Sequence, residues 1–191
     1  MKHRIAIFAS GNGGNFEAIA EAAIEGRMGD VEVALCVCDH PGARVCERAE
    51  RLGIELLCFN PGDFQNKAAF ETMIADTLDS KGIELVCLAG YMRIIGDVLL
   101  KRYGGRIINI HPALLPSFPG AHGIRDAYEY GVKVYGVTIH YVDSGVDTGK
   151  IIAQRAFPYT GNNLEELEGM IHSVEHPLYV ETITQLLKGD L

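Results

Sequence analysis

The fold is decided by the stretch RIAIFASGNGGNFEAIAEAAIEG, which covers residues 4–26. Residues 4–9 form an apolar run typical of a buried strand, and glycines within residues 10–15 break it. From residue 15 to residue 26, apolar side chains recur with helical spacing and end at a glycine. A strand, a glycine-rich turn and a helix in this order predict the first half of a βαβ unit.

The same alternation continues along the chain. Strands are predicted over residues 4–9, 31–39, 54–59, 85–89, 106–110, 134–142 and 150–158. Helices are predicted over residues 15–26, 43–52, 64–81, 124–130 and 164–187, the last with a kink or break at Pro177. These spacings predict an α/β fold with an open, mostly parallel twisted sheet and helices on both faces. The last two strands, joined by a short loop, are candidates for an antiparallel pair at one end.

Length and composition predict one domain over residues 1–191. The chain is 48% apolar and 22% charged, which is the balance of a globular protein. Its net charge of −8 argues against a nucleic-acid partner, which requires a basic face. A local phosphate site is compatible with that charge, because backbone N–H groups bind anions. No apolar stretch is long enough to cross a bilayer, so we expect a cytoplasmic protein without a membrane partner.

The five cysteines are expected to be reduced thiols. They are Cys36, Cys38, Cys46, Cys58 and Cys87, an odd number set in apolar runs. Cys36 and Cys38 form a C-x-C pattern rather than the C-x-x-C of zinc and redox sites. We therefore expect no metal, and no nicotinamide or flavin site is evident in the sequence.

Three segments carry candidate chemistry, and the first is Ser10-Gly-Asn-Gly-Gly-Asn15, between a strand and a helix. Glycines let the backbone approach a ligand closely, and a helix N-terminus supplies unpaired N–H donors that favour a phosphate. The same residues also fit a tight turn capped by Asn15, so both interpretations stay open, with phosphate binding favoured. The pattern lacks the third glycine of a dinucleotide fingerprint and the Lys-Ser/Thr of a Walker A loop.

The other two segments also follow predicted strands. Asn109 and His111 project to the same side of a strand's carboxyl end, where open α/β sheets bind ligands. They suit donation to an oxyanion and proton transfer, but a capping Asn and a surface His explain the pair equally well. The loop Asp143-Ser-Gly-Val-Asp-Thr-Gly149 is an ordinary turn by itself. Asp147 gains a catalytic role only if it lies beside His111, where its charge stabilises an imidazolium.

Taken together, these segments resemble the glycinamide ribonucleotide formyltransferase family, and the similarity runs from Ile5 to Val180. Further matching motifs are Leu88-Ala-Gly-Tyr-Met-Arg-Ile94, Ile108-Asn-Ile-His-Pro-Ala-Leu-Leu-Pro116, Pro119-Gly120, Gly136-Val-Thr-Ile-His140, Asp147-Thr-Gly149 and Glu175-His176. The resemblance implies a Rossmann-like formyltransferase fold. It also implies an enzyme of de novo purine (IMP) biosynthesis, with 10-formyltetrahydrofolate as its co-substrate. The formyl group would pass to the amine of glycinamide ribonucleotide, giving formylglycinamide ribonucleotide and tetrahydrofolate.

The resemblance implies the site residues as well. The catalytic residues are Asn109, His111 and Asp147. The residues on the substrate are Gly13, Gly14 and Asn15 at the phosphate, Glu175 at the ribose, and Met92 and Pro112 between the two ligands. The folate pocket is lined by Arg93, Ile94, Ile95, His140, Val142, Asp143 and Asp147. The N-terminal part of the domain is thereby expected to bind the substrate phosphate and the C-terminal part the folate.

The chain departs from the family pattern at four places. Gly14 stands where many relatives have Ser, His172 stands where they often have Gln or Lys, Ile124 stands where a second His often follows His122, and the chain ends at Leu191 where many continue. The first change removes a hydroxyl but keeps the backbone cradle, and the second keeps a hydrogen-bond donor. The expected state is a monomer or a weak homodimer, with a candidate exposed face around residues 96–103.

Two related enzymes and one binding module are the alternatives. A formyltetrahydrofolate hydrolase would use the same three catalytic residues with water as nucleophile, but such relatives usually carry an N-terminal regulatory domain. A transferase acting on methionyl-tRNA would want an added RNA-binding domain and a basic surface. A phosphate- or nucleotide-sensing module needs residues 10–15 but gives Asn109, His111 and Asp147 no task. Folate-dependent turnover discriminates between an enzyme and such a module.

Overall fold

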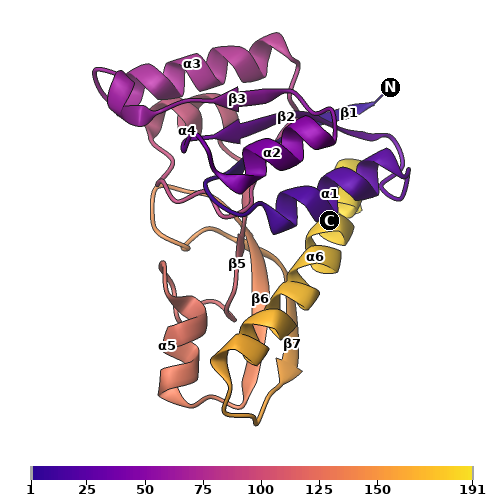
Figure 1. Cartoon of the computed structure of the whole chain (residues 1–191), viewed down its shortest axis with the longest axis vertical. Helices are drawn as coiled ribbons and strands as arrows, with labels where there is room; N and C mark the ends of the chain where they lie inside the picture. The colour runs from indigo at the N-terminus through magenta and orange to yellow at the C-terminus, as the bar shows by residue number, and fades with distance from the viewer. Residues whose placement is uncertain (1, 191) are drawn as a thin grey trace.

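The computed structural model describes residues 2–190, whose strands form a single sheet. The strands are β1 (His3–Ala9), β2 (Val31–Cys38), β3 (Leu56–Cys58), β4 (Leu85–Leu88), β5 (Ile107–His111), β6 (Val134–Tyr141) and β7 (Ile151–Pro158). Their order in the sheet is β3-β2-β1-β4-β5-β6-β7 (Figure 1). The first five strands are parallel, whereas β6 is antiparallel to β5 and β7 to β6. The predicted mostly parallel sheet with an antiparallel end is confirmed.

Helices cover both faces of the sheet, as predicted. They are α1 (Gly14–Ile24), α2 (Arg44–Arg51), α3 (Lys67–Ser80), α4 (Asp97–Tyr103), α5 (Gly123–Tyr130) and α6 (Leu164–Lys188), with a 3-10 turn, η1, at Pro61–Asp63. Ile5 and Ile7 of β1 pack with α1, α2, α5 and α6, whereas Ala6 and Phe8 pack with α3 and α4. Strand β1 is therefore buried on both faces, which explains its continuous apolar sequence. None of the helices in residues 2–190 has the length and apolar character that crossing a bilayer requires.

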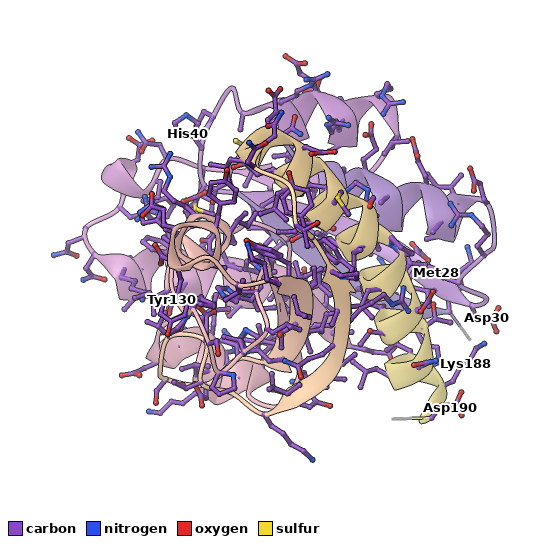
Figure 2. All side chains as sticks on the ribbon, turned by 90° about the horizontal axis from the view of Figure 1, so that it is seen from below. Met28, Asp30, His40, Tyr130, Lys188 and Asp190 are labelled. Carbon is purple, nitrogen blue, oxygen red and sulfur yellow. The ribbon has the colours of Figure 1, made fainter. Side chains whose placement is uncertain are left out.

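Helix α6 leads from the C-terminal half of the chain back to α1 (Figure 1). In Figure 2, Lys188 and Asp190 at its end lie on the same side of the molecule as Met28 and Asp30, which follow α1. The helix is continuous through Pro177, so the predicted break is wrong. Proline removes one backbone donor, and buried side chains before and after it hold the helix against the sheet. This path brings the middle of α6 to the start of α1.

The start of α3 differs from the sequence-based expectation. The helix begins at Lys67 rather than at residue 64, because residues 64–66 form a bend between η1 and α3. The Asn66 side chain accepts a hydrogen bond from Ala69 N at 2.9 Å and so caps the helix. The apolar side chain of Phe64, which suggested an earlier start, instead packs against the core formed with α3 and α4.

Helix α4 has no counterpart among the predicted helices, and residues 96–103 were expected to offer an exposed face. The inner side of α4 is buried through Leu99 and Tyr103, and its outer side is exposed at Asp97 and Lys101. The expectation is therefore correct for the charged side only. With seven residues, the helix is too short for its periodicity to stand out in the sequence.

Candidate functional site

A cleft of about 810 Å³ lies at the carboxyl ends of β1, β4 and β5. It is lined by the segments after these strands, residues 10–15, 88–95 and 109–112, together with the β6–β7 loop and part of α6. The strand order reverses between β1 and β4, because the chain goes from β1 outward to β3 and returns to β4 on the other side. Open α/β sheets bind ligands at such a switch point. The three candidate segments of the sequence therefore meet in one cleft.

One end of the cleft is formed by the glycine-rich turn before α1. Gly13 is the N-cap residue of α1 with φ 76°, and no described side chain caps this helix. The first-turn N–H groups of Gly14 and Asn15 have no intrahelical acceptor and are left for an anion. A Cβ at Gly13 would lie 2.6 Å from Cγ2 of Val45, so both the φ angle and the close packing require glycine.

Beside this turn, a buried carboxylate enters the cleft from α6. Glu175 is 4% exposed, and its Oε2 accepts hydrogen bonds from Asn15 Nδ2 at 3.3 Å and from His172 Nδ1 at 2.8 Å. The hydrogen bond to Glu175 raises the pKa of His172. Asn15 Oδ1 is buried and has no donor among the described residues. A hydroxyl group of a bound ligand would satisfy this oxygen.

The imidazole of His176 stands next to Gly14. A Cβ at Gly14 would come 3.4 Å from His176 Nε2, which is ordinary van der Waals contact, so the ring borders this position. Burial lowers the pKa of His176. The ring is therefore neutral at neutral pH and offers one N–H donor beside the backbone donors of the turn.

The other end of the cleft centres on the carboxylate of Asp147, in the β6–β7 loop. Its Oδ2 accepts a hydrogen bond from Gly120 N at 2.7 Å and lies 3.4 Å from His111 Nδ1. Its Oδ1 lies 3.5 Å from both Asn109 Nδ2 and His140 Nε2. Asp147 has φ 54°, a left-handed conformation that is uncommon outside glycine and least costly for Asn and Asp. The condition that the sequence left open, Asp147 beside His111, is met.

Hydrogen bonds to carbonyl groups fix the protons of the two histidines. His111 Nε2 is 2.7 Å from Phe118 O, and a carbonyl can only accept, so Nε2 carries a hydrogen. His111 Nδ1 is then the ring nitrogen that faces Asp147. His140 Nδ1 donates to its neighbour's carbonyl at 2.8 Å, which leaves Nε2 to accept from Asn109 Nδ2 at 3.2 Å. His140 orients the amide of Asn109, and His111 presents Nδ1 to the cleft.

Between the two ends, the cleft has an apolar side. Met92 is 74% exposed, Ile94 60% and Val146 50%, although large apolar side chains are usually covered. All three line the cleft, where Ile95 and Val142 add further apolar surface. Exposed apolar side chains around a concave site mark a ligand surface. A flat, mostly apolar ligand suits this side.

Asp39 connects the turn before α1 to the segment after β4. Ser10 Oγ donates to Asp39 Oδ1 at 2.5 Å and accepts a hydrogen bond from Met92 N at 2.9 Å. Arg93 Nε donates to Asp39 Oδ2 at 2.6 Å, and its guanidinium lies 5.9 Å from the centre of the Phe70 ring. These contacts fix the apolar side of the cleft relative to the glycine-rich turn.

A protein-family model described as "Formyl transferase" matches residues 3–183. The chain belongs to the formyl transferase family. The family resemblance carried by the sequence motifs is thereby confirmed.

Three bacterial proteins similar to this formyl transferase match it over nearly their whole length. The chain is 52% identical to phosphoribosylglycinamide formyltransferase of Bacillus subtilis (strain 168), over 96% of this chain and 94% of that protein. The crystal structure of glycinamide ribonucleotide transformylase 1 from Geobacillus kaustophilus gives a TM-score of 0.95 at 51% identity, covering 98% of this chain and 100% of that one. Phosphoribosylglycinamide formyltransferase from Streptococcus pneumoniae TIGR4 gives 0.90 at 48% identity, covering 98% and 99%. The predicted formyltransferase fold is confirmed.

All the site residues predicted for this formyl transferase line the one cleft. They are Gly13, Gly14, Asn15, Met92, Arg93, Ile94, Ile95, Asn109, His111, Pro112, His140, Val142, Asp143, Asp147 and Glu175. Two of them have surroundings that the sequence did not suggest. His140, expected in the folate pocket, lies against Asn109 and Asp147, and Ile95 is buried in the core beside α3 and α4. The ligand contacts of all these residues stay predictions.

Sequence reasoning missed the backbone contacts that hold the site together. Phe118 and Gly120 position His111 and Asp147 through backbone groups, which no side-chain pattern reveals. The prolines after residue 111 indicated irregular structure but gave no path for the chain. Asp39 had a usable signal, because it is a polar residue directly after the apolar strand β2, at the same edge of the sheet as Asn109.

Proposed function

We propose that this formyl transferase moves the formyl group of 10-formyltetrahydrofolate to the amine of glycinamide ribonucleotide, a step of purine biosynthesis. The observation that carries the proposal is the meeting of Asn109, His111 and Asp147 in a cleft whose other end is a glycine-rich helix N-terminus. Amide, imidazole and carboxylate groups next to an anion site suit group transfer to a phosphorylated amine. The names of the similar bacterial proteins support the same reaction.

The ribonucleotide occupies the end of the cleft beside α1. Its phosphate accepts hydrogen bonds from the backbone N–H groups of Gly13, Gly14 and Asn15, where the helix dipole favours negative charge. Its ribose hydroxyls donate to the Glu175 carboxylate and to Asn15 Oδ1, the buried oxygen without a donor. This placement leaves the amine pointing along the cleft towards Asn109.

The folate occupies the apolar side. Met92, Ile94 and Val146 cover its flat ring system, and this covering removes exposed apolar surface from water. The remaining predicted folate residues, Arg93, Ile95, His140, Val142 and Asp143, shape the pocket around it. Met92 and Pro112 lie between the two ligands. The formyl group then lies next to the Asp147 carboxylate, within reach of the amine.

The chemistry is a direct transfer. The neutral amine attacks the formyl carbon, and the carbonyl oxygen becomes an oxyanion that accepts hydrogen bonds from Asn109 Nδ2 and protonated His111 Nδ1. Asp147 stabilises the imidazolium and, through a water molecule, relays a proton from the new ammonium to N10 of the folate. The bond from carbon to N10 breaks, releasing formylglycinamide ribonucleotide and tetrahydrofolate. No covalent bond to the protein forms, and no cysteine takes part.

We also propose the domain organisation, location and oligomeric state in which the enzyme works. Residues 1–191 act as a single domain, with the phosphate bound by its N-terminal part and the folate mainly by later segments. The enzyme works on two small molecules in the cytoplasm, as a monomer or a weak homodimer, without a nucleic-acid or membrane partner. The transfer needs no metal, nicotinamide or flavin.

Folate absorbance tests the proposal. The enzyme is mixed with 10-formyltetrahydrofolate, with and without glycinamide ribonucleotide, and deformylation is followed in both samples. We expect deformylation only with the ribonucleotide present. Equal deformylation without it would identify a hydrolase, and none in either sample would identify a binding module; both results contradict the transferase.

A further inference from the structure

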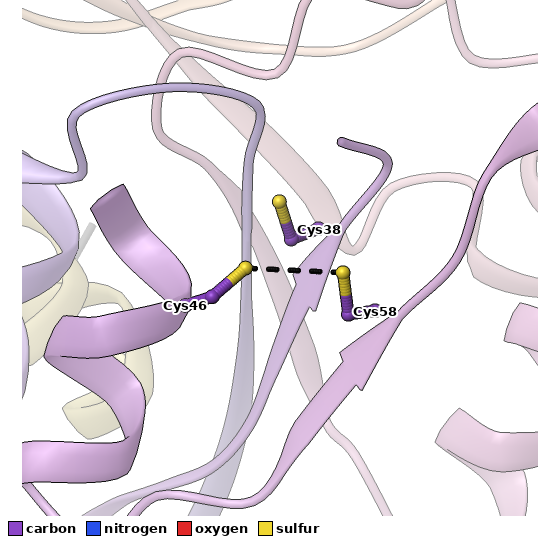
Figure 3. A group of neighbouring side chains, drawn as sticks. All are labelled: Cys38, Cys46 and Cys58. Carbon is purple, nitrogen blue, oxygen red and sulfur yellow. Dashed lines mark hydrogen bonds between the residues drawn. The ribbon is translucent and has the colours of Figure 1, made fainter. Parts of the chain in front are cut away.

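Three cysteines that the sequence separates meet at the carboxyl ends of β2 and β3. Cys38 ends β2, Cys46 lies in the first turn of α2, and Cys58 ends β3 (Figure 3). Their three sulfur atoms all lie within 4.8 Å of one another, and Cys46 Sγ is 3.8 Å from Cys58 Sγ. The other two cysteines, Cys36 and Cys87, are buried outside this group. We call Cys38, Cys46 and Cys58 the three-cysteine cluster.

The spacing of these sulfur atoms is close to that of thiolates around one metal ion. A zinc–sulfur bond is about 2.3 Å long, which places sulfur atoms about 3.8 Å apart in a tetrahedral site and about 4.0 Å apart in a trigonal one. The Cys46–Cys58 separation already has the tetrahedral value. The distances from Cys38 Sγ to the other two sulfur atoms exceed that value by at most about 1 Å. Three separate elements supply the ligands, so an ion would join β2, α2 and β3 without moving any of them far.

The chemistry of the donors selects the class of ion. Thiolates are soft ligands, which favour Cu(I), Zn(II) and similar d10 ions over magnesium or calcium. No His, Asp or Glu joins the group among residues 2–190, so the protein supplies three ligands of one kind. Burial raises the pKa of Cys38 to about 12 and also raises that of Cys58. The Cys38 and Cys58 thiols are therefore protonated and poor nucleophiles, which argues against a reactive redox centre.

We propose that the three-cysteine cluster binds one soft d10 metal ion through Cys38, Cys46 and Cys58. Three thiols lose their protons and become thiolate ligands, and a solvent molecule completes the shell of an ion that requires four ligands. Cys58 is only half-buried, which gives the ion a path from solvent. The site is distinct from the proposed transfer chemistry, in which no cysteine takes part.

The cluster lies directly behind the ribonucleotide end of the cleft. Val45, next to Cys46, donates its backbone N–H to Gly11 O at 3.0 Å. Asp39, next to Cys38, holds Ser10 and Arg93. A bound ion would therefore tie together the elements that support the glycine-rich turn. Because only the folded chain gathers the three sulfur atoms, the ion would bind it more tightly than the unfolded chain and would raise the melting temperature of the protein.

Cadmium titration of the full chain tests the proposal. Cd²⁺ is added to the reduced protein in a phosphine reductant, and the ultraviolet absorbance of cadmium–thiolate bonds is followed. We expect saturation at one ion per chain and a higher melting temperature. Cys58→Ser, at the half-buried position, is expected to weaken binding roughly tenfold or more. Cys87→Ala, outside the cluster, is the matched control and keeps wild-type binding.

Cys46→Ser is the second cluster variant, and circular dichroism shows whether each variant folds. The proposal is overturned if the wild-type chain gives no cadmium–thiolate absorbance. Equal binding by both folded cluster variants would also overturn it. So would a Cys46–Cys58 disulfide that forms in air, seen as the loss of two hydrogens by mass, in a protein that binds no ion when reduced.

Discussion

At the ribonucleotide end of the cleft the polar groups belong to two helices, whereas at the Asp147 end residues of β5 and β6 meet residues of two loops. Gly13 and Asn15 stand at the start of α1, and Glu175 lies in the middle of α6. Asp147 and Gly120 belong to irregular segments, joined to each other by one hydrogen bond. The end proposed for binding is thus fixed by helices, and the end proposed for chemistry also depends on the local contacts that hold a loop carboxylate against two strands. Substitutions at the two ends should affect different kinetic constants.

The largest effect is expected from Asp147→Asn, which removes the charge and keeps the shape. Asparagine tolerates φ 54°, and its oxygen can still accept from Gly120 N. The variant should fold normally and lose roughly 10³-fold or more in kcat, because the proton relay and the imidazolium partner are gone. Steady-state kinetics measures this. A kcat within tenfold of the wild type would contradict the assignment.

Asn109→Ala should be the next largest, at about 10²-fold in kcat with little change in the ribonucleotide KM. The substitution removes one donor to the oxyanion and leaves the helix N-terminus intact. Asn66→Ala is the control: it removes the N-cap of α3, costs about 1 kcal/mol of stability and leaves turnover unchanged. An equal rise in KM for both substrates in Asn109→Ala would mean that this residue binds rather than catalyses.

A smaller effect, on the ribonucleotide KM rather than on kcat, is expected from Gly13→Ala. Its φ of 76° and the 2.6 Å approach of Val45 Cγ2 strain any Cβ, at a cost of about 1–3 kcal/mol. Displacement of the turn should raise the ribonucleotide KM roughly tenfold while kcat changes little. Gly26→Ala is the matched control, since Gly26 has the same φ of 76° and open space around a Cβ but lies outside the cleft. Equal KM values for the two variants would show that the turn does not hold the phosphate.

The smallest effect concerns pH. The hydrogen bond to Glu175 raises the pKa of His172 above its ordinary value of 6.5, so the folded state binds this proton more tightly than the unfolded state. The resulting stability is fully present below pH about 6.5 and is lost as pH rises through the raised value. His172→Gln should flatten this part of the curve of melting temperature against pH. The exposed His122→Gln should not, and an unchanged curve in His172→Gln would rule out the ion pair.

Regular elements were predictable because their sequences carry their own periodicity. The apolar strands β1 and β4 and the amphipathic helix α6 stand out from neighbouring residues alone. Helix α4 is too short to do so, and Pro177 is tolerated because packing against the sheet outweighs one lost hydrogen bond. Local sequence therefore predicts well where a helix or strand lies. It predicts poorly whether that element continues through a residue such as proline, because the answer depends on packing against the rest of the protein.

The candidate site was predictable as a set of residues but not as a geometry. Asn109, His111 and Asp147 were found by motif, while their mutual placement depends on the backbone groups of Phe118 and Gly120. The three-cysteine cluster could not be predicted from the sequence for a related reason. Its members follow no metal-binding spacing, and only the pairing of β2 with β3 brings them together. Long-range contacts of this kind leave no trace in any single segment.

The separation of binding from chemistry is tested most directly by calorimetry on Asp147→Asn. Glycinamide ribonucleotide is titrated into the wild-type protein and into this variant, and the two Kd values are compared with the loss of kcat. We predict Kd values within a few-fold of each other beside a roughly 10³-fold loss of turnover. A Kd that rises in parallel with the loss of turnover would contradict the account, because the two ends of the cleft would then act as one site.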